Sequence, residues 1–121
     1  MSVDVTVRVR GVSSLGEGEA QTFSFQRGAR PEQGFVLRLG GTFVAYVNRC
    51  PHWGVELDLG DARFYAGDID RIYCTNHGAL FLPLTGECEA GPCTGGRLES
   101  LPLRPDGPDV VVTIPRTRIE A

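Results

Sequence analysis

The stretch FVLRLGGTFVAYVNRCPHWG occupies residues 35–54 and joins a strand pattern to a cysteine and a histidine. Two runs rich in valine, phenylalanine and other strand-favouring residues flank Gly40 and Gly41, which is a pattern typical of a β-hairpin. Cys50 and His52 follow directly after the second run. We therefore predict a strand pair whose second strand leads into a loop that carries a Cys-x-His motif.

A second cysteine–histidine pair lies in YCTNHG, residues 73–78, as Cys74 and His77. His52 and His77 are the only two histidines of the chain, and 21 residues separate His52 from Cys74. That spacer is long enough for one strand pair to return the chain to the first loop. Thiolate and imidazole ligands in equal number suit zinc or an iron–sulfur centre. The sequence thus predicts a metal site made of Cys50, His52, Cys74 and His77.

The rest of the chain favours short strands over helices. Valines alternate with polar residues over residues 3–9, phenylalanines do so over residues 20–26, and residues 63–74 predict a strand pair turned at residues 66–68. Residues 109–115 predict a last strand, and sixteen glycines with eight prolines interrupt the chain too often for long helices. We predict a single all-β domain, a sandwich or small barrel of short antiparallel strands.

Composition limits the possible functions. The net charge of -3 gives no electrostatic support to nucleic-acid binding, and the absence of lysine excludes Schiff-base chemistry. No apolar run approaches the roughly 18–20 residues that span a bilayer, and the amino terminus lacks a secretion-signal pattern, so we expect a cytoplasmic protein with no membrane partner. The acidic spacer of residues 53–73 is either a solvated loop or a face that steers a basic partner.

The ordered set of motifs resembles the Rieske [2Fe–2S] family, whose pattern is Cys-x-His-x-Gly, a spacer, and Cys-x-x-His-Gly. The resemblance spans about residues 20–115. It implies one domain over residues 1–121, with cluster-binding loops at about residues 48–94 inserted in a β-sandwich base. Further positions that match the family's pattern around the cluster are Gly54, Leu57, Gly78, Phe81 and Pro92, the last of these in a third, proline-bearing loop.

The resemblance implies that Cys50 and Cys74 bind the buried iron and that His52 and His77 bind the outer iron. Two ferric ions, two sulfides and two thiolates sum to a neutral oxidised centre, whereas four thiolates would make it -2. Reduction of the neutral centre is easier, so the family's potentials lie at roughly -150 to +300 mV.

Three departures from the high-potential members of the family predict the low end of that range. Those members carry a serine and a tyrosine at the positions of Ala79 and Phe81, where hydroxyl donors raise the potential. They also carry a disulfide between the two loops, at the positions occupied here by Val55 and Asn76. The pattern therefore resembles the soluble ferredoxins that serve bacterial ring-hydroxylating oxygenases.

The resemblance implies an electron-transfer protein rather than an enzyme. The chain is too short for the catalytic domain of Rieske oxygenases, and no histidine remains for a second iron site or a general base. We expect it to pass electrons from a flavin-dependent reductase to a terminal oxygenase or another redox partner, as a monomer or as the small subunit of a complex. Alternatives are the small subunit of a nitrite reductase-like complex, and a zinc-ribbon-like binding module without a redox role.

Three further residues remain open to more than one interpretation. Trp53 follows a predicted ligand directly, and it either packs on the third loop or provides a hydrophobic docking contact for the redox partner. Cys88 and Cys93 are predicted to be buried thiols near the cluster, with a disulfide between them as the alternative. Leu57 and Phe81 are expected to shield the cluster from water.

Overall fold

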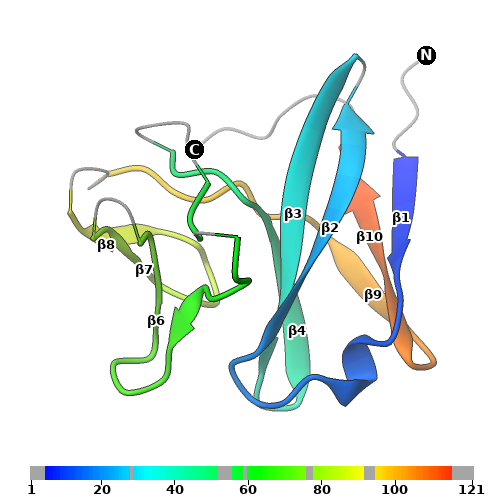
Figure 1. The fold of residues 1–121 in the computed structure, drawn as a ribbon, viewed down its shortest axis with the longest axis horizontal. Helices are drawn as coiled ribbons and strands as arrows, with labels where there is room; N and C mark the ends of the chain where they lie inside the picture. Colours follow the sequence, from blue (N-terminus) through cyan, green and yellow to red (C-terminus); the bar gives the residue numbers. More distant parts are fainter. Residues whose placement is uncertain are drawn as a thin grey trace.

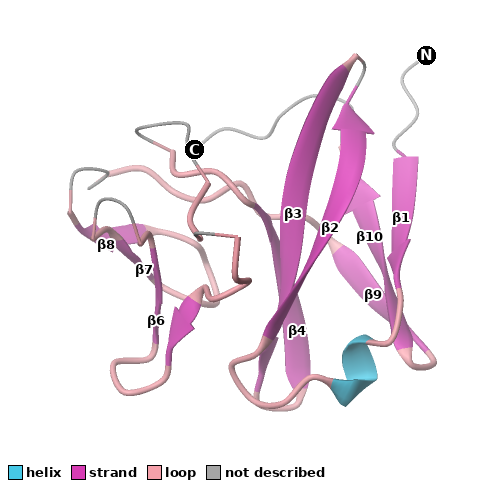
Figure 2. Cartoon of the chain, viewed as in Figure 1, coloured by secondary structure: helices cyan, strands magenta, loops and turns pink. Residues whose placement is uncertain are grey.

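The computed structural model describes residues 5–27, 29–51, 56–58, 60–75, 78–91 and 95–115, and these residues form an almost entirely β structure. The strands form three antiparallel sheets, and the described residues contain one short 3₁₀ segment, η1 (Val12–Ser14); Figure 2 colours both kinds of element. The predicted all-β class is thereby confirmed. The strands are β1 (Val5–Val9), β2 (Ala20–Arg27), β3 (Arg30–Leu39), β4 (Thr42–Val47), β5 (Tyr65–Ala66), β6 (Arg71–Tyr73), β7 (Leu80–Phe81), β8 (Cys88–Ala90), β9 (Leu103–Asp106) and β10 (Asp109–Ile114).

Two of the sheets form the base of the molecule, on the right of Figure 1. Their strand orders are β1-β10-β9 and β2-β3-β4. The predicted hairpin is present, because β3 and β4 pair with Leu39 opposite Thr42. Side chains that alternate along β10, Val110 and Val112 among them, pack between the two sheets against Val36 and Val47.

The third sheet, β5-β6-β7-β8, lies on the left of Figure 1 and carries the predicted ligand loops. Its core contains Phe35 and Leu37, which alternate along β3 with Val36 of the other core. Strand β3 is therefore covered on both faces, and this explains its uninterrupted apolar run of residues 35–37.

The sequence patterns missed the first part of β3 and the whole of β9, as well as the short strands β7 and β8. Strand β3 begins at Arg30 and not near residue 35, and it forms a second hairpin in which Arg27 lies opposite Arg30. The polar run of residues 30–33 hid this segment, since its apolar contacts begin only at residue 35. Strand β9 contains Pro105, which is tolerated because β9 lies at the edge of its sheet. No helix within the described ranges is long and apolar enough to cross a membrane.

Candidate metal centre

Cys50 and Cys74 lie close to strand ends, as the sequence predicts, and they meet in one core. Cys50 comes three residues after the end of β4, and Cys74 follows β6 directly. Both are at most 1% exposed and neither forms a disulfide. They share a hydrophobic core with Leu57 and Phe81, which are fully buried. The structure thus brings together two thiols that are 24 positions apart, and it encloses them in apolar side chains.

The nitrogen half of the predicted ligand set lies outside the described residues. His52 and His77 belong to that part of the chain, as do Trp53, Gly54 and Pro92. Within the described ranges, no group of three or more histidine, cysteine, aspartate or glutamate residues is placed to hold a metal ion. The assignment of four ligands therefore remains a prediction, while the burial of the two cysteines is observed.

The loop that begins at Cys74 is closed by two backbone hydrogen bonds. The Gly78 N–H donates to the Cys74 carbonyl at 2.9 Å, and the Cys74 N–H donates to the Ala79 carbonyl at 2.9 Å. Gly78 has a φ of 69°, a left-handed conformation that glycine adopts without a steric penalty. The glycine that ends the Cys-x-x-His-Gly motif is thus needed to turn the chain into β7.

Asn48, which precedes the first predicted ligand by two positions, organises the first loop. Its carboxamide oxygen accepts a hydrogen bond from the Leu57 N–H at 2.8 Å. The Leu57 carbonyl in turn accepts from the Thr75 N–H at 2.8 Å, next to Cys74. Asn48 was not predicted from the sequence to have a role. The sequence feature that could have indicated it is a polar residue at the end of an apolar strand, shortly before the Cys-x-His motif.

The third loop packs against the second loop at Gly91. A Cβ atom added to Gly91 would lie 2.8 Å from Cα of Ala79, and Gly91 has a φ of 102°. Only glycine fits this contact, because both the space and the backbone conformation exclude a side chain. The third loop therefore contacts the second loop at Gly91, while Pro92, which was expected next to the cluster, lies outside the described residues.

Cys88, on β8, was predicted from the sequence to be a buried thiol. This prediction is wrong, because Cys88 is disulfide-bonded in the structure. Cys93, the partner in the alternative interpretation, lies outside the described residues. The correction distinguishes Cys88 from the two cysteines proposed as ligands, which are reduced thiols.

Three aromatic side chains belong to the same buried core as the two cysteines. The rings of Phe35 and Phe64 stack with their centroids 4.0 Å apart, and Tyr46 packs beside Phe35. The Tyr46 hydroxyl donates to the Pro83 carbonyl at 2.8 Å, and burial raises the pKa of Tyr46 to about 12. Because Pro83 follows β7, this hydrogen bond ties the ligand-bearing sheet to β4 of the base.

The acidic spacer is less uniformly exposed than its composition suggests. Asp58 is buried, whereas Glu56, Asp61 and Asp68 are exposed. Asp70 accepts a hydrogen bond from the Tyr65 hydroxyl, and this bond is the main cause that raises the Tyr65 pKa to about 12. The hypothesis of an acidic docking face therefore cannot include Asp58.

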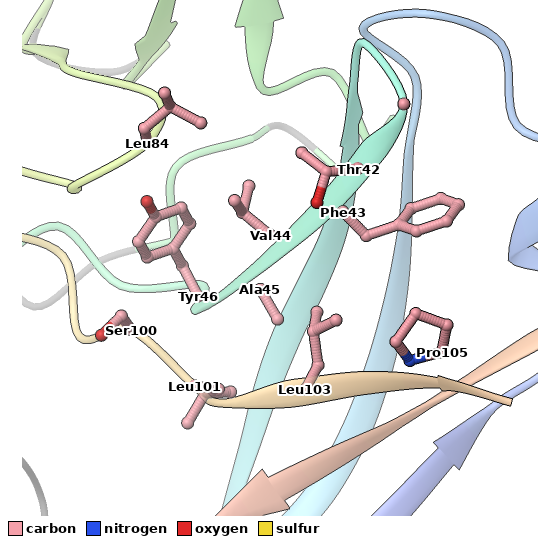
Figure 3. Close-up of a pocket in the computed structure, with 11 residues that line it drawn as sticks. Thr42, Phe43, Val44, Ala45, Tyr46, Leu84, Ser100, Leu101, Leu103 and Pro105 are labelled. Carbon is pink, nitrogen blue, oxygen red and sulfur yellow. The ribbon is translucent and has the colours of Figure 1, made fainter.

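A separate groove of about 460 Å³ lies between β4 and the segment that leads into β9, and Figure 3 shows its lining. Phe43 of β4 and Leu103 of β9 contribute apolar side chains, and Leu84 projects from the loop between β7 and β8. None of its lining residues is a cysteine or a histidine. The groove is therefore distinct from the predicted metal centre.

The chemistry of the observed residues fits an iron–sulfur cluster. Two buried thiols that are not oxidised to a disulfide offer soft ligands, and their surroundings are apolar. A site for calcium or magnesium would instead need a shell of oxygen ligands. The sulfur donors and the dry surroundings are what a cluster with cysteine ligation requires.

Comparisons with known proteins agree with this fit. The Rieske [2Fe–2S] domain matches residues 6–105. The ferredoxin of carbazole 1,9a-dioxygenase from Nocardioides aromaticivorans is 26% identical with a TM-score of 0.68, over 88% of this chain and 95% of that one. A putative NADH-dependent nitrite reductase small subunit from Mycobacterium tuberculosis is 19% identical with a TM-score of 0.68, over 93% and 96% of the two chains, and shows the shared fold. No curated protein sequence matches the chain. Since the domain match covers most of its length, the chain belongs to the Rieske [2Fe–2S] domain family and binds a Rieske-type [2Fe–2S] cluster.

Proposed function

We propose that this chain is a one-electron carrier in which Cys50 and Cys74 bind one iron of the cluster and His52 and His77 bind the other. The observation that carries the proposal is the convergence of two buried, reduced cysteines from loops of the predicted motifs. When bound, such a cluster supplies a one-electron redox couple. The protein's own part is to hold the thiolates in place and to keep water away with Leu57 and Phe81, which are fully buried.

The described residues around the cysteines support a potential near the low end of the family's range. Ala79 and Phe81 are fully buried in the same core as Cys50 and Cys74, and neither has a hydroxyl group. Hydrogen bonds to cluster or ligand sulfurs stabilise the reduced state, so their loss lowers the potential. We expect a midpoint near -150 mV, the lower limit given above for Rieske centres.

The proposed physiological role is the ferredoxin component that supplies an oxygenase with electrons from a flavin-dependent reductase. One solved structure similar to this chain is a complex of reduced oxygenase and oxidised ferredoxin in carbazole 1,9a-dioxygenase, at 26% identity over 94% of this chain. Catalysis would then belong to the partner, because both histidines are assigned to the cluster. Trp53 remains our candidate for the docking contact, and Trp53→Ala should slow electron transfer while preserving the cluster spectrum.

The second candidate role is that of a small subunit in a nitrite reductase-like complex. The nitrite reductase small subunit matches this chain over nearly its whole length, which supports a shared fold. A carrier exchanges partners and should purify alone, whereas a subunit should co-purify with its large chain at constant stoichiometry. The family assignment leaves the zinc-ribbon alternative without support. We further propose that residues 1–121 form one domain and that the protein works in the cytoplasm.

Electron paramagnetic resonance of the dithionite-reduced protein, with a redox titration, tests the ligand assignment. The wild-type protein should give a signal of low average g value, which is characteristic of mixed histidine and cysteine ligation. Cys74→Ser should lose this signal, while the control Cys88→Ser should keep it, because Cys88 lies outside the proposed ligand set. A Cys74→Ser variant that retains the wild-type signal would refute the assignment.

A further inference from the structure

A buried polar pair, Asn48 and Asp58, lies in the wall of the first ligand loop. The two residues are 4% and 5% exposed. The Asn48 amide Nδ2 donates both to Oδ1 of Asp58 at 3.0 Å and to Oε1 of Gln33 at 2.7 Å. The Asn48 Oδ1 accepts from the Leu57 N–H at 2.8 Å. Each polar atom of the Asn48 carboxamide therefore has a partner, and the loop between Asn48 and Asp58 is held at both ends.

The Asp58 side chain accepts a hydrogen bond at each of its two oxygens. Its Oδ1 accepts from Asn48, and its Oδ2 accepts from the Ala62 N–H at 3.0 Å. Both partners are donors, which suits a carboxylate, because a carboxylate only accepts hydrogen bonds. No arginine within the described ranges forms an ion pair with Asp58. Among the described residues, the donors to this buried carboxylate are therefore both neutral.

Asp58 lies between Cys50 and Cys74 in the sequence, and hydrogen bonds connect its segment to the start of both ligand loops. Asn48 is two positions before Cys50, and Asp58 follows Leu57, which shares a core with Cys50 and Cys74. The Leu57 carbonyl also binds the backbone of Thr75, directly after Cys74. A charge buried at this position is poorly screened by water, so it acts on neighbouring redox centres more strongly than an exposed charge does.

From this geometry we propose that Asn48 and Asp58 are a positioning pair that keeps a negative charge beside the cluster and thereby lowers its reduction potential. The inference rests on the proposed function, since it assumes that the loop holds the cluster. A fixed negative charge disfavours the added electron, so neutralising Asp58 should shift the potential upward. The charge of Asp58 and the lack of hydroxyl donors at Ala79 and Phe81 would thus both lower the reduction potential.

The test compares Asp58→Asn with Asp61→Asn in the cluster-loaded protein. Asp61 lies three positions further along, and its side chain is 47% exposed, so both variants remove one formal charge from the same segment. We expect Asp58→Asn to raise the potential clearly more than Asp61→Asn does, and to keep that shift in high salt. Equal shifts, or a shift of Asp58→Asn that salt abolishes, would overturn the proposal.

The double variant Asn48→Asp with Asp58→Asn separates charge from folding. In the exchanged pair, the carboxylate introduced at position 48 can accept from Leu57, from the new amide at position 58 and from a rotated Gln33 amide, while the new amide oxygen accepts from Ala62. Every hydrogen bond of the pair can therefore be restored with the charge retained. We expect cluster loading and a potential near that of the wild type, even if Asp58→Asn alone fails to load.

Two results with the double variant would refute the positioning pair, namely failure to load the cluster and a potential raised as far as in Asp58→Asn. Thermal unfolding followed by circular dichroism reports folding independently of the cluster. The two proposals fail in different ways. If the wild-type protein lacks the Rieske signal, the proposed function is wrong. If that signal is present but the charge comparison fails, only the role of Asp58 is wrong.

Discussion

Replacing Gly91 with alanine should separate the second and third loops of the cluster-binding region. The added Cβ would lie 2.8 Å from Cα of Ala79 and 3.3 Å from its backbone nitrogen. These are backbone atoms directly after the second ligand motif, so a side-chain rotation cannot relieve the overlap. Either the third loop or the loop that holds Cys74 must move.

The magnitude follows from two contributions. Alanine at a φ of 102° is strained by roughly 1–3 kcal/mol, as is usual for a non-glycine residue at positive φ. The steric overlap adds about 1–3 kcal/mol, which is typical of overpacked sites. Gly95 supplies a matched control, because its φ of 96° is similar but nothing lies within 4 Å of an added Cβ. The control carries the first contribution without the second.

Thermal unfolding of the cluster-loaded variants measures both contributions. For a domain of this size, 1 kcal/mol corresponds to roughly 4 °C in Tm. Gly91→Ala should therefore unfold about 4–12 °C below Gly95→Ala and should lose its visible absorption sooner on heating. Equal Tm values for the two variants would refute the contact between the third loop and Ala79.

Three further predictions concern the base of the molecule. Tyr46→Phe removes the hydrogen bond to Pro83 and should lower the free energy of unfolding in urea by about 1–2 kcal/mol. Burial raises the pKa of Tyr46 from 10.0 to about 12, so the stability that its neutral form contributes is lost as the pH rises through this range. Tyr46→Phe should not show that part of the loss. Equal slopes of the unfolding free energy against pH for both proteins between pH 10 and 12 would contradict this prediction. Glu32→Ala removes the carboxylate 3.4 Å from the Arg27 guanidinium, which is only 8% exposed, but Glu99 stays paired with Arg27 at 3.0 Å. Urea unfolding should therefore show about 1–3 kcal/mol of destabilisation, less than for a buried charge without any partner, and a loss well below about 1 kcal/mol would argue that the pair of Glu32 and Arg27 does not stabilise the fold.

Much of the fold was predictable because strand signals are local. The hairpin across Gly40 and Gly41 and the strand at residues 109–114 were visible as runs of β-branched and aromatic residues. Strand β9 was not, because a proline at a sheet edge looks like a loop residue until its neighbour is known. The start of β3 was missed for a similar reason, since its first residues gain strand structure from pairing with β2.

The candidate site was likewise predictable only in part. Two cysteines at these spacings after strand patterns were enough to predict that they converge, and the structure buries both of them together. Nothing in the chain, however, indicated that Asn48 would hold Asp58 or that Asp58 would be buried. An aspartate in an acidic spacer normally predicts an exposed residue. The disulfide at Cys88 was equally open, because connectivity does not follow from the number of cysteines.

The sequence alone determined the all-β class and the resemblance to Rieske domains, and it supplied the predicted ligand set, because each depends on residue identity and short spacing along the chain. Only the tertiary structure decided that β3 is covered on both faces, that Gly91 packs on Ala79, and that the acidic spacer contains a buried charge. These features depend on which segments, distant in the sequence, pack against one another. Burial, steric overlap and electrostatic screening arise from that packing, and local composition does not specify them.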